Sequence, residues 1–364
     1  MIYTKGAIES YRSDSLAEII LAANNLTPLS KLKVDFDSVC FVCGEKMVDT
    51  KMDHKKKKTD EHLIPKWLLK ELKIRERKAK ITLPNSTTSF LDRSIIPCCH
   101  DCNTGYMSRL ENREVKRVLK KEISSLNDED EFVLFCWFSK IVSGQILRMT
   151  TFPNDRSKPD SEMIIPPDKM NLKSEIFTLP KLIRYPNVAF YKFKPFSFYA
   201  FELLEESSKN PIPHIIGLRF PVILFVYKKK AYLMALGEGG AIKEYFPKMT
   251  VSSNTPGDIL MNFSRVCTQY ELLIPNYYYE AERDNETGLL YIRRVPKLVG
   301  IAPFKPMNRA VLEKNINEHF AQWEIDIEYE WVDGNLRYWS PKVMTPEKLQ
   351  KKRKKTTKRK EKKR

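Results

Sequence analysis

The sequence predicts an α+β protein in which a small cysteine-bearing module precedes a strand-rich region and a basic tail. Three observations support this fold class. Two CxxC pairs lie within the first third of the chain, residues 127–148 carry an apolar helical pattern, and apolar residues alternate as in strands from about 186 to 340. The residues expected to bind metal or to take part in a reaction therefore lie in the first third of the chain.

Four parts follow from shifts in composition. We expect a helical lead (1–34), a cysteine module (35–125), an α+β region assigned by position to target recognition or partner binding (126–340) and a disordered Lys/Arg-rich tail (341–364).

The order of elements follows from caps and turns. Asp14 or Ser15 is placed to cap a helix over 14–24, and Asn127 with the following DEDE begins the buried helix that ends near Arg148. A further helix is expected at 308–322. The last hairpin is expected to turn at the Asp333-Gly334 pair.

Charge is concentrated at the end of the chain. The formal net charge is +17, and KKRKKTTKRKEKKR (351–364) holds eleven Lys or Arg and one Glu, or +10, which leaves +7 for the rest. So dense a run cannot pack and is expected to be solvated. It suits non-specific contact with phosphates, and the alternative is a solubility tail or localisation signal.

Composition indicates a soluble protein. Hydrophobic residues make up 42% of the chain, which is enough for a core, and no uninterrupted apolar stretch approaches 18 residues. The N-terminus shows no apolar segment behind a basic start, so we expect no signal peptide, a cytoplasmic location and no membrane partner.

The cysteines indicate a metal site. Cys40 with Cys43 and Cys99 with Cys102 form two CxxC pairs, the spacing of a closed tetrahedral Zn²⁺ site that pins two distant segments. Cys98 can replace Cys99 in this set, although only Cys99 repeats the spacing of the first pair. Two further cysteines, Cys136 and Cys267, lie in apolar surroundings and are expected in the core.

A histidine follows two acids in TDEHLIPKW (59–67), in a chain that has only five histidines. A cap, a core residue, a metal ligand and a catalytic base are the candidate roles of His62. A zinc ribbon that only binds nucleic acid would explain the cysteines, but it would leave this segment and the Asn103 that follows Cys102 unexplained.

The order of these motifs resembles the zinc-stapled branch of the HNH endonucleases, the ββα-metal nucleases. The shared features are CxxC, an acid–His–apolar–apolar–Pro strand, and CxxCN opening a helix. The run NTGYMSRLEN (103–112) is similar to a CNxGWMSxLE-type signature of a bacterial subgroup, with Tyr106 where Trp is commoner, and Trp137 and Lys140 match its later Trp…Lys helix. The resemblance covers about residues 38–150.

The resemblance implies a catalytic site for phosphodiester hydrolysis. His62 would activate water, while Glu61 and Asn103 would bind one Mg²⁺ or Mn²⁺ that stabilises the developing charge. Adjacent strand residues point to opposite faces, however, so Asp60 is the alternative ligand on the His62 side. The middle Asn of the family pattern has no clear counterpart, and Asp92 is its possible replacement.

Other polar residues near the motifs have ordinary interpretations. Glu111 is expected to form a salt bridge with Arg109 or Arg113. The histidines at positions 54 and 100 are expected to be exposed bystanders. The lysine-rich insert KMDHKKKK (51–58) is either a grip on the phosphate backbone or a solvated loop.

The sequence therefore predicts a metal-dependent HNH-type endonuclease acting on DNA, in restriction, phage defence or a mobile element. The alternatives are a non-catalytic, zinc-stabilised nucleic-acid-binding protein and a scaffold subunit whose tail recruits nucleic acid.

Overall fold

The computed structural model divides the chain into two compact units, residues 1–305 and 306–364. It describes residues 10–24, 38–48, 53–76, 78–83, 88–155, 157–158, 160–166, 177–185, 187–204, 214–217, 220–245, 255–274, 276–299, 303–305, 308–321, 327–332 and 335–341. Helices and strands are mixed throughout, which confirms the predicted α+β class.

An antiparallel sheet forms the centre of the first unit. Its strand order is β7 (Phe196–Glu202), β10 (Lys230–Leu236), β9 (Val222–Tyr227) and β8 (His214–Gly217). Helices α6 (Ala241–Tyr245) and α7 (Pro256–Leu272) pack against it, and the residues between β10 and α7 share an apolar core. Nearly every described residue of β9 and β10 is buried, as expected for strands covered on both faces.

A second sheet has the order β1 (Ser10–Ser13), β11 (Tyr277–Arg283), β12 (Leu290–Pro296) and β6 (Val188–Tyr191). Only the β12–β6 pair is parallel. Helix α1 (Leu16–Ala23) packs on this sheet and is capped by the Ser15 side chain, which accepts from the backbone N–H of Glu18. The predicted first helix and its cap are confirmed.

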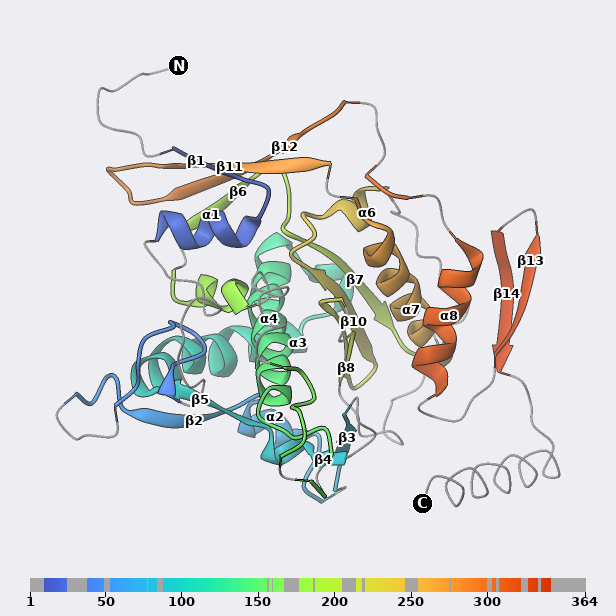
Figure 1. Cartoon of the computed structure of the whole chain (residues 1–364), viewed down its shortest axis with the longest axis horizontal. Coiled ribbons are helices and arrows are strands. Elements are labelled where there is room, and N and C mark those ends of the chain that lie inside the picture. The colour runs from blue at the N-terminus through green and yellow to red at the C-terminus, as the bar shows by residue number, and fades with distance from the viewer. Residues whose placement is uncertain are drawn as a thin grey trace. The chain divides into compact units, whose positions relative to one another are not determined.

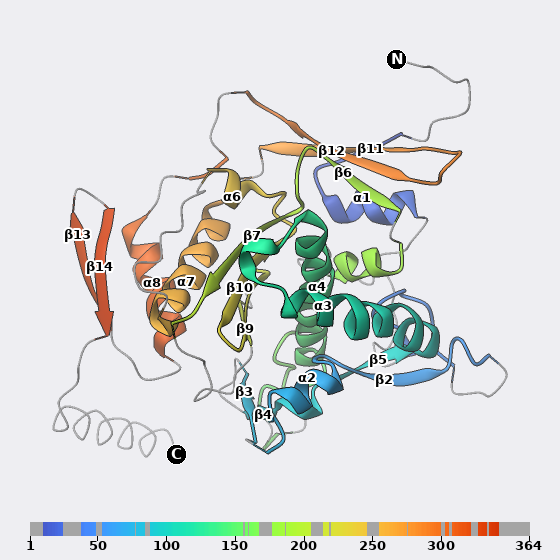
Figure 2. The same cartoon turned by 180° about the vertical axis from the view of Figure 1, so that it is seen from behind.

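Helix α4 (Asp128–Met149) joins the parts of the first unit. The Asn127 side chain caps it and Asp130 completes a capping box, as the Asn-DEDE pattern predicts. The helix lies between the β2–β5 ribbon and the sheet that contains β7 and β10 (Figure 1), and the view from behind keeps this order (Figure 2). It is long and apolar enough to cross a membrane, but 94% of its apolar window is buried inside the protein. This burial is that of a core helix.

The β2–β5 ribbon and the elements around it carry most of the predicted site residues. β2 (Lys58–His62) pairs antiparallel with β5 (Ile95–Cys99), from Lys58 opposite Cys99 to His62 opposite Ile95. The chain between these two strands forms α2 (Lys66–Glu71), the hairpin of β3 (Lys80–Thr82) and β4 (Thr88–Phe90), and the 3₁₀ turn η3 (Leu91–Arg93). The chain after β5 is helical through η4 (Asp101–Met107), η5 (Leu110–Val115) and α3 (Lys116–Lys120), and the first two have π-helical hydrogen bonding. A 3₁₀ turn, η6 (Ile123–Ser125), precedes α4.

One apolar core runs from the cysteine segments through α4 to both four-stranded sheets. Trp137 of α4 meets the Phe225 ring of β9 edge to face, and Phe135 stacks on Phe196 of β7. Cys136 and Cys267 are buried, as predicted. The region after residue 126 therefore provides one wall of the cysteine module's core.

The second unit contains α8 (Arg309–Ala321) and the antiparallel hairpin of β13 (Ile327–Val332) and β14 (Asn335–Pro341). Both were predicted. The Asp333-Gly334 turn and the tail beyond Pro341 lie outside the described residues.

Helices α6 and α7 lie between residues 186 and 308, where the sequence analysis predicted strands and no helix. Thr255 and Asp258 form a capping box for α7, and Pro256 occupies its first turn. The sequence does carry this start signal in TPGD.

Candidate functional site

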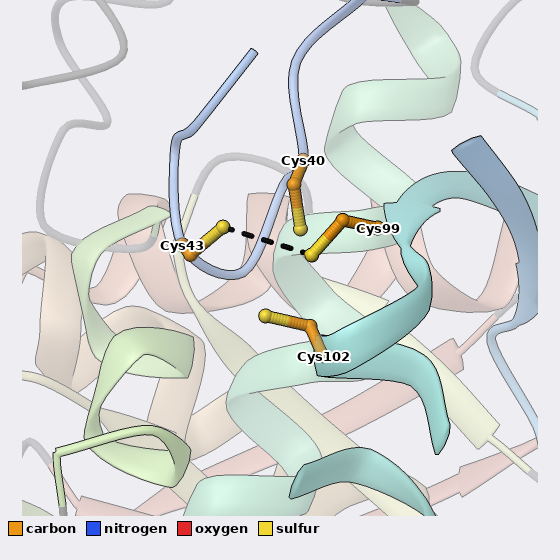
Figure 3. Close-up of side chains that lie close together, drawn as sticks. All are labelled: Cys40, Cys43, Cys99 and Cys102. Atoms are coloured by element: carbon orange, nitrogen blue, oxygen red, sulfur yellow. Dashed lines mark hydrogen bonds between the residues drawn. The ribbon is translucent and has the colours of Figure 1, made fainter. Parts of the chain in front are cut away.

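Four buried cysteine thiols converge at one end of the β2–β5 ribbon. Cys40 and Cys43 lie on a tight loop in which the N–H of Gly44 donates to the Cys40 carbonyl at 2.8 Å, and Gly44 takes a φ of 76° that favours glycine. Cys99 ends β5 and Cys102 lies in the helix that follows. Their sulfur atoms point toward one another (Figure 3) and all lie within 4.8 Å of one another.

The arrangement fits a zinc ion. Four Zn–S bonds of about 2.3 Å in a tetrahedron separate the sulfur atoms by about 3.8 Å. The Sγ atoms of Cys43 and Cys99 are 3.9 Å apart. A hydrogen bond with Cys102 lowers the pKa of Cys40, Cys43 and Cys99, which favours their thiolate forms, while hydrogen bonds with the other thiols raise the pKa of Cys102. The predicted pairing of the two CxxC motifs in a four-cysteine cluster that can hold a metal such as zinc is confirmed.

The choice between Cys98 and Cys99 has a geometric answer. Cys99 belongs to the set of four mutually close sulfur atoms. Cys98 is also buried, and its Sγ lies 3.7 Å from the Sγ of Cys40, but it is outside that set. A fifth thiol therefore lies beside the cluster.

Two cations from a distant segment face the thiols. They come from the 3₁₀ helix η8 (Leu179–Ile183) and the residue after it. Arg184 donates from Nη1 to the Cys102 sulfur at 3.7 Å and lies 3.6 Å from Glu45. Lys181 is almost fully buried, and burial lowers its pKa to about 8 although Cys43 and Cys40 oppose that shift. The cluster thus joins three segments of the chain.

His62 and Glu61 occupy opposite faces of β2. Glu61 is 7% exposed and turns toward α4, whereas His62 is half-buried and Asp60 is exposed. Burial lowers the pKa of His62, and the positive charges of Lys66, Lys140 and Arg75 add to that effect against the opposing charge of Glu61. The imidazole is therefore neutral at neutral pH and able to accept a proton.

Lys140 is buried at the centre of an ionic cluster on the inner face. Its Nζ binds the Glu61 carboxylate, donates to Oε1 of Glu111 at 2.5 Å and donates to the backbone carbonyl oxygen of His62 at 2.6 Å. The indole N–H of Trp137 donates to the same Glu111 oxygen at 3.1 Å. The predicted arginine partners of Glu111 are therefore wrong.

Protonation in this cluster is set by burial and charge. Burial raises the pKa of Glu111 to about 7, with Lys140 opposing the shift and Glu61 adding to it. Burial alone would lower the pKa of Lys140, but the two carboxylates hold it above its usual value. Lys140 therefore stays charged between them.

Close packing of α4 against the β2–β5 ribbon allows Lys140 to reach β2. Gly144 lies one turn after Lys140 on α4, and a Cβ there would meet the side chains of Leu63 and Ile96, the latter at 2.9 Å. The missing side chain lets the helix backbone approach the ribbon, which places the Lys140 ammonium within reach of β2.

Asn103 bridges the helix to the other end of β2. Its Nδ2 donates to the Thr59 hydroxyl at 3.0 Å and to the Asp60 carbonyl oxygen at 3.3 Å. Thr59 in turn donates to the Cys98 carbonyl oxygen at 2.7 Å. The amide nitrogen of Asn103 is thus occupied, and its carbonyl oxygen is the atom that can act as a ligand.

His54, His100 and Asp92, which the sequence analysis singled out, have specific neighbours. The rings of His54 and His100 lie with centroids 4.1 Å apart, which joins the lysine-rich insert to the end of β5. Asp92 pairs with Arg75 at 3.3 Å. The sequence gives no sign of either contact, because the partners are far apart in the chain.

Comparisons of the chain with protein-family models, with curated proteins and with solved structures found no match. The geometry of this site is therefore the basis on which a function is proposed below.

Proposed function

We propose that the protein is a metal-dependent endonuclease of the HNH type that hydrolyses phosphodiester bonds in DNA. The observation that carries the proposal is the arrangement of β2, β5 and the helix after Cys99. The antiparallel ribbon presents His62 on its outer face, and Asn103 reaches back to β2 from the helix. The four-cysteine cluster fixes the helix and ribbon together.

His62 is the general base of the proposed reaction. A base must be unprotonated before it takes a proton from water, and the lowered pKa of His62 keeps it so near neutral pH. Its backbone carbonyl is held by Lys140, which limits movement of the residue along the strand.

The proposed divalent cation, Mg²⁺ or Mn²⁺, supplies positive charge beside the phosphate and the leaving oxygen. Glu61 and Asn103 are the predicted ligands, with Asp60 as the alternative. Because Lys140 occupies Glu61 on the inner face, we favour Asp60, whose exposed side chain shares the outer face with His62. One carboxylate with an amide oxygen, water and substrate phosphate suits Mg²⁺.

Charge around the site supports an anionic substrate. Lys66 and Arg75 are close enough to His62 to affect its pKa, and both are exposed. The chain carries a formal net charge of +17. Cations beside a solvent-accessible histidine favour phosphate binding there.

The test is nicking of supercoiled plasmid with Mg²⁺ or with EDTA. We expect Mg²⁺-dependent nicking that His62→Ala reduces at least 100-fold, since general bases contribute roughly 10²–10⁴-fold. His54→Ala is the matched control, because it removes another imidazole from the same region. Cutting that survives His62→Ala would contradict the assignment of His62.

The pH dependence gives a second readout. Activity of a basic imidazole rises with pH through its pKa, so a lowered pKa extends the plateau below the usual histidine value of about 6.5. A non-catalytic binder, the alternative, would shift plasmid mobility in both variants and nick in neither.

A further inference from the structure

The outer face of the β2–β5 ribbon is polar on one strand and apolar on the other. On β2, Asp60 and His62 lie on this face. On β5, Ile95 lies directly opposite His62, and Pro97 lies directly opposite Asp60. Residues that face each other across an antiparallel pair point to the same side, with Cβ atoms about 4.5–5.5 Å apart. The proposed general base therefore has an apolar neighbour on the adjacent strand.

The exposed fractions place Ile95 on the solvent side of the ribbon. Ile95 is 39% exposed, whereas Ile96, which lies opposite the buried Glu61, is 1% exposed. Of the large apolar residues that are exposed in the described part of the chain, Ile95 is the one on this ribbon. Its side chain can therefore contact a substrate that is bound at His62.

The apolar strand offers little to a hydroxyl group. Neither Ile95 nor Pro97 has a side-chain donor or acceptor. Pro97 also lacks a backbone N–H, and its carbonyl oxygen accepts from the N–H of Phe41 at 3.4 Å. A hydroxyl packed against these two side chains would lose its hydrogen bonds to water and gain none from them.

Positive charge near His62 comes from a different segment. Lys66 begins α2, Arg75 follows this helix, and both are exposed and act on the His62 imidazole through their charges. A nucleotide has the same division, because its phosphate is anionic and its sugar is largely apolar at C2′ when the sugar is deoxyribose. A phosphate beside these cations and a sugar against Ile95 would match the surface around His62.

We propose that Ile95 is a specificity-determining residue, which packs against the sugar next to the scissile phosphate and selects deoxyribose over ribose. The inference rests on the proposed function and deepens it by giving a reason for the substrate class. The C2′ methylene of deoxyribose can contact Ile95, whereas the 2′-hydroxyl of ribose would be stripped of water there. A hydroxyl without a partner should weaken binding roughly 10- to 100-fold.

The test compares three duplexes of one sequence, made of DNA, of RNA and of 2′-fluoro RNA. The fluoro duplex keeps the A-form shape of RNA, but its 2′ substituent cannot donate a hydrogen bond. Binding is measured by fluorescence anisotropy in proteins that carry His62→Ala, and cutting is measured with His62 intact. With Ile95 present, RNA should bind roughly 10- to 100-fold more weakly than the fluoro duplex, and DNA at least as tightly as the fluoro duplex.

Three variants isolate the contribution of Ile95. Ile95→Thr keeps a β-branched side chain and adds a hydroxyl that can pair with the 2′-hydroxyl, so RNA should come within about 3-fold of the fluoro duplex. Ile95→Val stays apolar and should keep the preference. Ile274→Thr makes the matched change at another isoleucine, which is 45% exposed, and should also keep it. Zinc content and melting temperature should be unchanged in all three.

The outcomes separate the two proposals. If native protein cuts DNA but Ile95→Thr keeps the native ratio of fluoro to RNA binding, the assignment of Ile95 is overturned and the nuclease stands. Equally weak binding of RNA and the fluoro duplex to native Ile95 assigns the preference to helix shape and also overturns it. Absence of cutting together with an Ile95-dependent ratio overturns the nuclease and keeps the sugar contact. Absence of both overturns both proposals.

Discussion

Two buried polar clusters hold the β2–β5 ribbon, one at each end. At the Cys99 end, the thiols of Cys99 and Cys102 and two thiols from the distant loop of Cys40 and Cys43 can share one metal ion. At the His62 end, a single ammonium lies between two carboxylates and a backbone carbonyl. The thiol cluster depends on an ion from solution, whereas the Lys140 cluster is complete within the chain. We call the four thiols at the Cys99 end the conditional anchor, because it needs an ion to be complete. The Lys140 cluster at the His62 end is the permanent anchor.

The largest effect is expected from breaking the conditional anchor. Cys99→Ser should lower zinc content from one ion per chain to none and unfold the ribbon, because structural zinc contributes roughly 10–16 kcal/mol in small zinc peptides at pH 7. Elemental analysis and circular dichroism measure both changes. Cys98→Ser is the control and should keep the zinc, and the reverse result would assign Cys98 as the ligand.

Breaking the permanent anchor should cost less. Lys140→Met leaves two buried carboxylates without their cation, which should lower the free energy of unfolding by about 3–5 kcal/mol. Lys194→Met removes a partly exposed lysine paired with Asp128 and Glu131 and should cost less than about 1 kcal/mol. Urea unfolding followed by tryptophan fluorescence compares the two, and equal losses would show that burial does not distinguish them.

Protonation of Glu111 should make the stability of the permanent anchor depend on pH. Its pKa is raised from 4.5 to about 7, so the folded state binds this proton more tightly than the unfolded state does. The corresponding stability is present below pH 4.5 and is lost as pH rises through about 7. In the native protein this group should lower the urea midpoint at pH 8 relative to pH 5. Glu111→Gln should remove that contribution to the difference. Parallel profiles for both proteins would contradict it.

The smallest effect is expected at Gly144. Overpacking costs about 1–3 kcal/mol, while alanine gains about 1 kcal/mol over glycine in a helix, so Gly144→Ala should lose about 1 kcal/mol. Gly105→Ala is the control, since the nearest atom to its added Cβ is 3.9 Å away. Thermal melting should show a lower midpoint for Gly144→Ala alone.

The difference between the clusters also explains what the sequence could predict. The CxxC spacing is local, so the sequence alone predicts Cys40, Cys43, Cys99 and Cys102 as one set of ligands. The caps of α1 and α4 are equally local. Lys140 meets Glu61 across 79 residues, and no periodicity encodes that distance.

Glu111 shows how a local rule can mislead. Arg109 and Arg113 are its near neighbours, but residues two apart on a helix do not face each other. Arg109 instead donates to the Gly105 carbonyl, and Glu111 turns inward to Lys140. The roles predicted for His62, Asn103 and the outer-face ligand stay predictions.

The two cations of residues 177–185 have an electrostatic consequence. Four thiolates around a zinc ion would carry a formal charge of −2, and transfer of that dianion to the interior would be costly. Lys181 and Arg184 supply two positive charges beside it. The segment of η8 and Arg184 therefore supplies a built-in counter-charge, and a zinc ion, its four thiolates and these two cations together would be close to neutral.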